Sequence, residues 1–154
     1  MRRIVLLSSI VGLLLALTGP ALAGPATHST EDVTGDVFVC DTAVYTVTSG
    51  TISIVVHEGA SASGNQNFTV TITPRKVKAV DEAGNQFSIV GAIWFGGTIN
   101  ANTGGEQFTD TEKFQIVSKG GGTVDSVNVT GHITIQPNNF VIKEFDFGTC
   151  APPE

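Results

Sequence analysis

Two pairs of carboxylates are the side chains in this sequence best spaced to do chemistry. Asp110 and Glu112 form one pair, and Glu144 and Asp146 form the other. Residues two apart in a strand lie on the same face, so each pair would present two carboxylates side by side. General acid–base catalysis and glycoside hydrolysis use such pairs. Alternating acids more often mark a solvent-facing strand, and we therefore predict no catalytic residues.

The histidines give no stronger sign of chemistry. His28, His57 and His132 are far apart in the sequence, and the chain has neither a His-x-x-x-His nor a Cys-x-x-Cys motif. A zinc site needs three or four converging ligands. We therefore predict no metal and no other cofactor. The alternative is a cyclase or hydrolase that uses Glu144, Asp146 or His132 as acid and base, and only analogy between folds supports it.

The first 23 residues have the pattern of a signal peptide. Arg2 and Arg3 precede an apolar run over residues 4–17, and Ala21-Leu22-Ala23 supplies a small-x-small cleavage site. The run is shorter than the roughly 20 residues of a membrane span. We expect cleavage before Gly24, a secreted mature protein and no membrane span.

The chain has two cysteines, which lie near the two ends of the expected folded part. Cys40 and Cys150 are an even pair in a chain that we expect to be exported to an oxidising compartment. We predict that they form one disulfide. A bond between positions so far apart would bring the beginning and the end of the domain together.

The charge excludes some partners. The chain has a formal net charge of −6, and loss of the leader would remove two arginines and no acid. An acidic protein repels phosphate backbones, so we expect neither nucleic acid nor an anionic membrane surface as partner. The basic cluster at Arg75, Lys76 and Lys78 is typical of a solvated strand end.

The remaining pattern is that of strands and turns. Short runs rich in Val, Ile and Thr alternate with turns rich in Gly, Asn and Asp, and no segment has a capped helical period. Phe68, Val70 and Ile72, for example, alternate with threonines, as in a half-buried antiparallel strand. We expect about eight strands, at residues 36–41, 43–48, 51–57, 67–78, 86–95, 107–118, 124–136 and 139–148.

We predict that these strands form an up-and-down antiparallel β-barrel closed by the disulfide. Gly91 and Gly131 fall on the inward side of their strands, where a missing side chain permits bending. A β-sandwich with adjacent termini is the alternative. The expected organisation is a signal peptide at 1–23, a flexible leader at 24–34, one β domain at 35–150 and a tail at 151–154.

One strand, at residues 86–95, is apolar on both faces. Val90, Ala92 and Trp94 occupy the face that is polar in the other strands. A loop folded over the strand, or a central position in a sandwich, would cover them. An uncovered patch around Trp94 would instead serve a protein partner, a sugar ring or a second subunit. These three residues are our candidate binding residues.

Three sequence segments carry a family resemblance: Phe38-Val39-Cys40, Gly131-His132-Ile133-Thr134 followed by Asn139-Phe140-Val141, and Thr149-Cys150. Their arrangement resembles uncharacterised small exported bacterial all-β proteins, with an early cysteine, a Gly-punctuated meander and a C-terminal cysteine. The resemblance covers most of the mature chain and implies no activity. Lipocalins share the expected barrel form, but their Gly-x-Trp signature in the first strand is missing.

These observations favour a binding or surface-interaction protein. An eight-stranded barrel is just wide enough to be filled by side chains or to hold one small ligand. We expect either a small apolar molecule in the barrel or another surface component bound at the Trp94 face. The enzyme and a purely structural role at the cell surface are the alternatives, and the sequence does not specify the oligomeric state.

Overall fold

The computed structural model describes residues 24–61, 63–136, 138–146 and 148–150. The signal peptide predicted at 1–23 and the tail at 151–154 lie outside these residues. The described residues form eight strands: β1 (Thr27–Asp32), β2 (Val37–Val39), β3 (Val44–Ala60), β4 (Gln66–Val80), β5 (Gln86–Ile99), β6 (Glu106–Ser118), β7 (Gly122–Gln136) and β8 (Asn139–Asp146). The fold is therefore all-β, as predicted.

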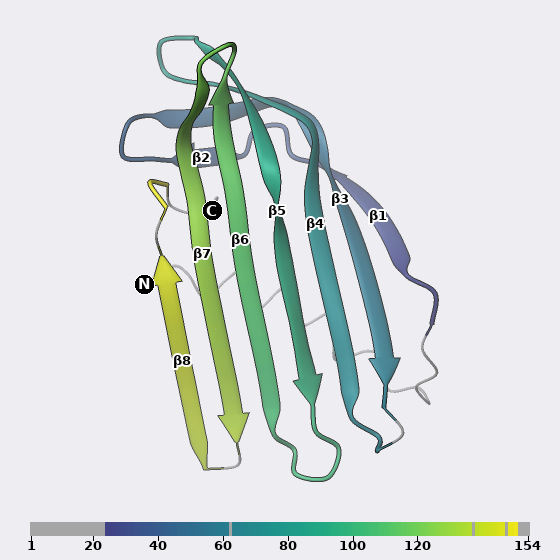
Figure 1. Ribbon diagram of the computed structural model, residues 1–154. Coiled ribbons are helices and arrows are strands. Elements are labelled where there is room, and N and C mark those ends of the chain that lie inside the picture. The colour runs from purple at the N-terminus through teal and green to yellow at the C-terminus, as the bar shows by residue number, and fades with distance from the viewer. Residues whose placement is uncertain (1–23, 62, 137, 147, 151–154) are drawn as a thin grey trace.

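The strands form one antiparallel meander sheet in the order β1-β3-β4-β5-β6-β7-β8. β2 also pairs with β3, on the same edge of β3 as β1 but nearer its beginning. Figure 1 shows the long strands side by side, with β1 and β8 at opposite edges. Six intervals of about 4.8 Å separate these two strands.

The predicted barrel is wrong, and so is the alternative sandwich. Among the described residues, no strand pairs with the outer edge of β1 or β8, and no second sheet is present. The disulfide between Cys40 and Cys150 was predicted correctly. It does not close a barrel, because it joins the segments that follow β2 and β8 and not the edge strands themselves.

The sheet is bent near one end. Pairing is irregular between Val47 and Thr51 of β3 and between Ile72 and Val77 of β4. The first part of β3 runs across the upper end of the sheet in Figure 1, and the strand then turns down along it. The bend divides the molecule into a rolled end, which contains β2 and the disulfide, and an open part, which extends to the other ends of the long strands.

The main core cluster fills the rolled end. Its members come from six strands and the C-terminal segment: Phe38, Tyr45, Val47, Val77, Ala79, Ile89, Phe114, Ile116, Val127, Val129 and Cys150. The Asp41 N–H donates to the Thr149 carbonyl at 2.7 Å, and the Thr149 N–H donates to the Ser126 carbonyl at 2.8 Å. The C-terminal segment thus connects β7 to the chain that follows β2.

The strand predictions were right in kind but too short at the bend. Predicted strands 43–48 and 51–57 are one strand, β3, which continues through an irregular stretch at Ser49 and Gly50. A second difference is at the leader, because part of the segment 24–34 is β1, paired with Thr51–Val56 of β3. The leader has no apolar alternation, and backbone hydrogen bonding to an exposed edge does not require one.

Gly91 provides a test of the bend. Its φ is +132°, a value that residues with a side chain rarely adopt, and a Cβ built there would collide with the Lys113 carbonyl of β6. We expect Gly91→Ala to lower the free energy of unfolding by about 2 kcal/mol. Urea unfolding followed by circular dichroism would measure this, with Gly131→Ala as control, because a Cβ at Gly131 meets only an ordinary contact. Equal free energies of unfolding for Gly91→Ala and Gly131→Ala would contradict a specific requirement for glycine at position 91.

Candidate functional site

The open part of the sheet has two unlike faces. Directly paired residues share a face, so the register assigns each position. We call the face that continues into the rolled core the inner face, and the opposite one the outer face. The described strands form a single sheet, so no second sheet of described residues lies over either face of the open part.

The inner face is apolar over three neighbouring strands. The residues are Ile52, Ile54 and Val56 of β3, Phe68, Val70 and Ile72 of β4, and Ile93, Phe95 and Ile99 of β5. Phe68 and Phe95 are buried, and the others are half-buried. Phe108 of β6 extends the surface, since its ring centroid lies 5.9 Å from that of Phe68 and 6.2 Å from that of Phe95. We call this surface the apolar floor.

Carboxylates adjoin the floor on β6. Asp110 pairs with Phe95 of β5 and Gly131 of β7, and Glu112 pairs with Ile93 and Val129 in the next row. Both residues are half-buried, and one oxygen of each carboxylate is shielded from solvent. Beyond β5 the inner face is therefore mixed. The rows of Asp110 and Glu112 carry carboxylates, and the row of Phe108 continues with Ile133 of β7 and Ile142 of β8.

The register brings the backbone positions of the two predicted carboxylate pairs into the same two rows of the sheet. Position 144 of β8 is opposite Gly131, and position 146 is opposite Val129. Positions 110 and 144 are therefore the two neighbours of Gly131, and positions 112 and 146 are the two neighbours of Val129. Spacing alone predicts a common face within each pair, and only the pairing of β6, β7 and β8 brings the two pairs into register.

The histidine of the enzyme alternative lies elsewhere. His132 pairs with Thr109 and Lys143, one residue out of phase with Glu144, so it lies on the outer face. Its ring is exposed and makes hydrogen bonds with Thr109 (3.0 Å) and Thr134 (3.3 Å). His132 therefore lies on the opposite face of the sheet from Asp110 and Glu112.

The candidate binding residues lie on the outer face of β5. Trp94 is 41% exposed and Val90 is 45% exposed, while Ala92 between them is half-buried. From the two apolar faces of this strand, the sequence suggested that a loop or a second sheet would cover these residues. No second sheet of described residues does so. The indole lies over Gly96, because a Cβ built on that glycine would be 2.8 Å from Cζ2 and Cη2 of Trp94.

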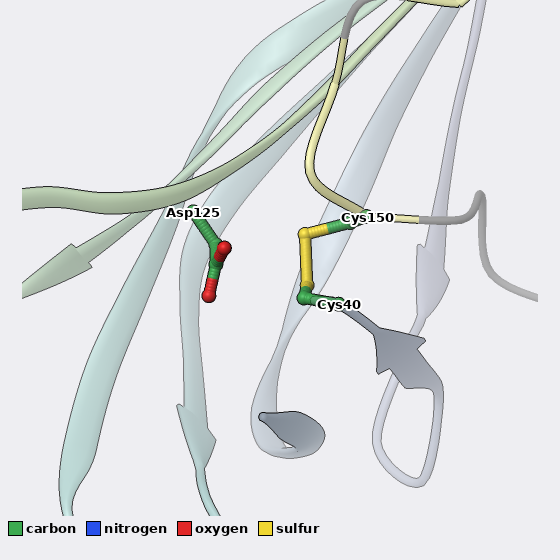
Figure 2. A group of neighbouring side chains, drawn as sticks. All are labelled: Cys40, Asp125 and Cys150. Atoms are coloured by element: carbon green, nitrogen blue, oxygen red, sulfur yellow. A yellow bond between two sulfur atoms is a disulfide. The ribbon is translucent and has the colours of Figure 1, made fainter. Parts of the chain in front are cut away.

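A third arrangement, which the sequence reasoning missed, lies beside the disulfide. Asp125 of β7 is only 2% exposed, and Figure 2 shows its carboxylate close to the bridge between Cys40 and Cys150. It accepts hydrogen bonds from the hydroxyls of Tyr45 and Thr149, both at 2.7 Å, and from that of Thr42. The sequence did contain one sign of this, because Asp125 alternates in step with Val127 and Val129 and so belongs to the inward-facing side of its strand.

These hydroxyls determine the ionisation of Asp125. Burial by itself raises the pKa of the carboxyl, but the hydrogen bonds from Thr42, Tyr45 and Thr149 outweigh it and hold the pKa below its ordinary value. Burial, followed by the hydrogen bond to Asp125, raises the pKa of the Tyr45 phenol. Asp125 is therefore a buried anion that fastens the beginning of β3 and the C-terminal segment to β7.

This cluster is not a metal site in the disulfide-bonded protein. The Sγ atoms of Cys40 and Cys150 and a carboxylate oxygen of Asp125 lie within 4.8 Å of one another. Both sulfurs are, however, committed to the disulfide. Metal ions bind thiolates, and a disulfide has none.

The fold and these surfaces define an all-β protein in which one disulfide-bridged end supports an open sheet with two differently composed faces. No family model, curated protein or solved structure matches the chain. None of the described residues forms a helix that could cross a membrane. The function must therefore be argued from the two faces.

Proposed function

We propose that this is an exported binding protein that holds an amphiphile, with an apolar chain and a cationic head, on its inner face. The observation that supports this is the half-buried apolar floor of β3, β4 and β5, over which no second sheet of described residues lies. Uncovered apolar surface of this kind marks binding sites in folded proteins. It replaces the barrel interior as the place for a small apolar ligand.

The floor suits an extended chain. From Phe68 to Ile72 it runs along four residues of β4, which is about 14 Å at strand spacing. Each methylene group moved from water to such a surface contributes about 0.8 kcal/mol. The rings of Phe68, Phe95 and Phe108 lie at the far end of the floor from the bend, where they form its widest apolar contact.

The carboxylates beside the floor select the head group. Asp110 and Glu112 lie one strand from Phe95 and Ile93, which is about 4.8 Å across the sheet. A cation there is attracted by both carboxylates, and an anion is repelled. The half-buried position of these groups strengthens the attraction relative to a fully exposed pair.

The test compares three decyl amphiphiles below their micellar concentrations: decyltrimethylammonium, decyl sulfate and an uncharged decyl ethylene glycol ether. We expect isothermal titration calorimetry on the purified protein to give at least tenfold tighter binding of the ammonium compound than of the other two. Asp110→Asn with Glu112→Gln should abolish this preference and leave binding of the uncharged ether unchanged.

Asp41→Asn with Glu82→Gln is the matched control. It removes the same charge from two exposed residues away from the inner face of the open part. Equal affinities for the three amphiphiles, or an equal loss in the control pair, would contradict the proposal. Native mass spectrometry of protein purified without detergent would report a ligand retained from the producing cell.

A further inference from the structure

The outer face around Trp94 carries a second, chemically different set of groups. Its rows run across β4, β5, β6 and β7, and each position is assigned by direct pairing. One row contains Thr69, Gly96, Thr109 and His132. The next row towards the bend contains Thr71, Trp94, Thr111 and Thr130. Except for the indole, this surface consists of hydroxyl and imidazole groups with a glycine among them.

The ring of Trp94 lies over Gly96, which has no side chain. The ring reaches along β5 to the next position on the same face, and Gly96 beneath it is buried. A side chain at position 96 would push the indole away. The backbone at Gly96 thereby supports this end of the ring, and the side chain as a whole remains 41% exposed.

A depression continues this surface beyond Gly96. It lies at the ends of β5, β6 and β7, where Thr98, Gln107 and Thr134 form the next row of the outer face. The rest of its lining is mixed and comes from Asn100, Thr103, Gly105, Glu106, Ile135 and Gln136. Along β5, Gly96 and Thr98 are two residues apart, which is about 7 Å.

The polar groups on this surface are held in place by one another. The Thr98 hydroxyl donates to the Asn67 side-chain carbonyl at 2.8 Å, and the His132 ring lies between the hydroxyls of Thr109 and Thr134. Hydroxyl and amide groups both donate and accept hydrogen bonds. Such groups, fixed beside an exposed aromatic ring, suit a ligand that is itself a dense array of hydroxyls.

We propose that the outer face binds an uncharged saccharide, with one sugar ring stacked on Trp94 and the next residues of the chain directed into the depression. The C–H groups on one side of a pyranose ring carry partial positive charge and pack on the negative π face of the indole. The hydroxyls around the ring edge then meet the threonine, asparagine and glutamine side chains. A purely apolar partner would bury these polar groups and could accept or donate none of the further hydrogen bonds that they offer.

This proposal is independent of the amphiphile site. The two surfaces lie on opposite faces of the sheet, because Trp94 and Phe95 are consecutive residues of β5. Asp110→Asn with Glu112→Gln should therefore leave saccharide binding unchanged. Failure of either proposal says nothing about the other.

Trp94 is the only tryptophan in the chain, so its fluorescence reports directly on the site. The probes are hexasaccharides of glucose, in both α-1,4 and β-1,4 linkage, and of N-acetylglucosamine, mannose and xylose. We expect at least one of them to produce a saturable blue shift and protection from acrylamide quenching at up to millimolar concentration. The affinity should not change between 50 and 500 mM salt, because the ligand is uncharged.

Variants distinguish stacking from a nonspecific effect. Calorimetry should show at least a tenfold weaker affinity for Trp94→Ala and a measurable loss for Gln107→Ala. Val37→Ala is the matched control, since Val37 is an exposed valine of β2 in the rolled end, away from the outer face around Trp94. Thermal unfolding should be similar for all three variants, because each change is at a surface side chain.

Binding of none of the five hexasaccharides would overturn the proposal. So would unchanged affinity in Trp94→Ala, or an equal loss in Val37→Ala. A steep decrease of affinity with salt would show that the ligand is recognised by charge, which would also contradict it.

Discussion

Replacing Cys40 and Cys150 together by alanine is expected to lower the free energy of unfolding by about 4 kcal/mol. The two residues are 110 positions apart, so the bond removes much of the conformational freedom of the unfolded chain. In the chain-entropy model a loop of this size corresponds to between about 4 and 5 kcal/mol. The rolled end should suffer most, because the bond holds its first and last segments together.

Guanidinium unfolding of the oxidised protein and of the double variant would measure this difference. Reduction of the wild-type protein should reproduce the loss, and the same reductant should leave the variant unchanged. A difference below 1 kcal/mol would mean that hydrogen bonds such as that from Asp41 to Thr149 suffice to hold the two segments together.

Asp125→Ala is expected to cost about 3 kcal/mol of stability, the second largest effect. The carboxylate accepts hydrogen bonds from the hydroxyls of Thr42, Tyr45 and Thr149, and its removal leaves these groups without their acceptor. Hydrogen bonds to a charged group contribute about 1.5–3 kcal/mol each, and their effects are not additive. Asp125→Asn should cost less, because the amide oxygen still accepts.

Chemical unfolding at pH 7 would measure both variants. A cycle with Thr149→Val isolates one contact, and its coupling energy should be about 1 kcal/mol or more, because the two side chains are in direct contact. Asp81→Asn is the control, since Asp81 accepts its hydrogen bonds within an exposed turn. A loss in Asp81→Asn as large as in Asp125→Asn would contradict a special role for the buried carboxylate.

The same carboxylate predicts how stability depends on pH. The pKa of Asp125 is lowered in the folded protein, so its contribution is complete above the ordinary pKa of about 3.9 and is lost as pH falls through the folded value. The pKa of Tyr45 is raised, so its contribution is complete below about 10 and is lost as pH rises through its folded value. Compared with the wild type, Asp125→Asn should show a flatter acid limb in unfolding experiments between pH 2 and 7.

Part of the candidate sites followed from the sequence. Alternation predicted that Trp94 lies on the other face of its strand from Ile93 and Phe95. Spacing predicted that Asp110 and Glu112 share a face. Both predictions depend only on the two-residue period of a strand. The sequence could not show that Trp94 is uncovered or that Gly96 lies under its ring. The first depends on the single layer that the described strands form and the second on the rotamer of Trp94, and both are properties of the assembled sheet.

The sequence by itself determined the strands from β4 to β8, to within four residues at each end, and the disulfide, because these follow from alternation, turn residues and cysteine pairing. Only the tertiary structure decided that the sheet bends at Gly50, Lys76 and Gly91 and stays open beyond the bend. Whether a meander closes depends on twist and irregular pairing accumulated over all its strands, and no single strand encodes this sum. Asp125 was missed for a related reason, since its three partners come from segments that meet only at the rolled end.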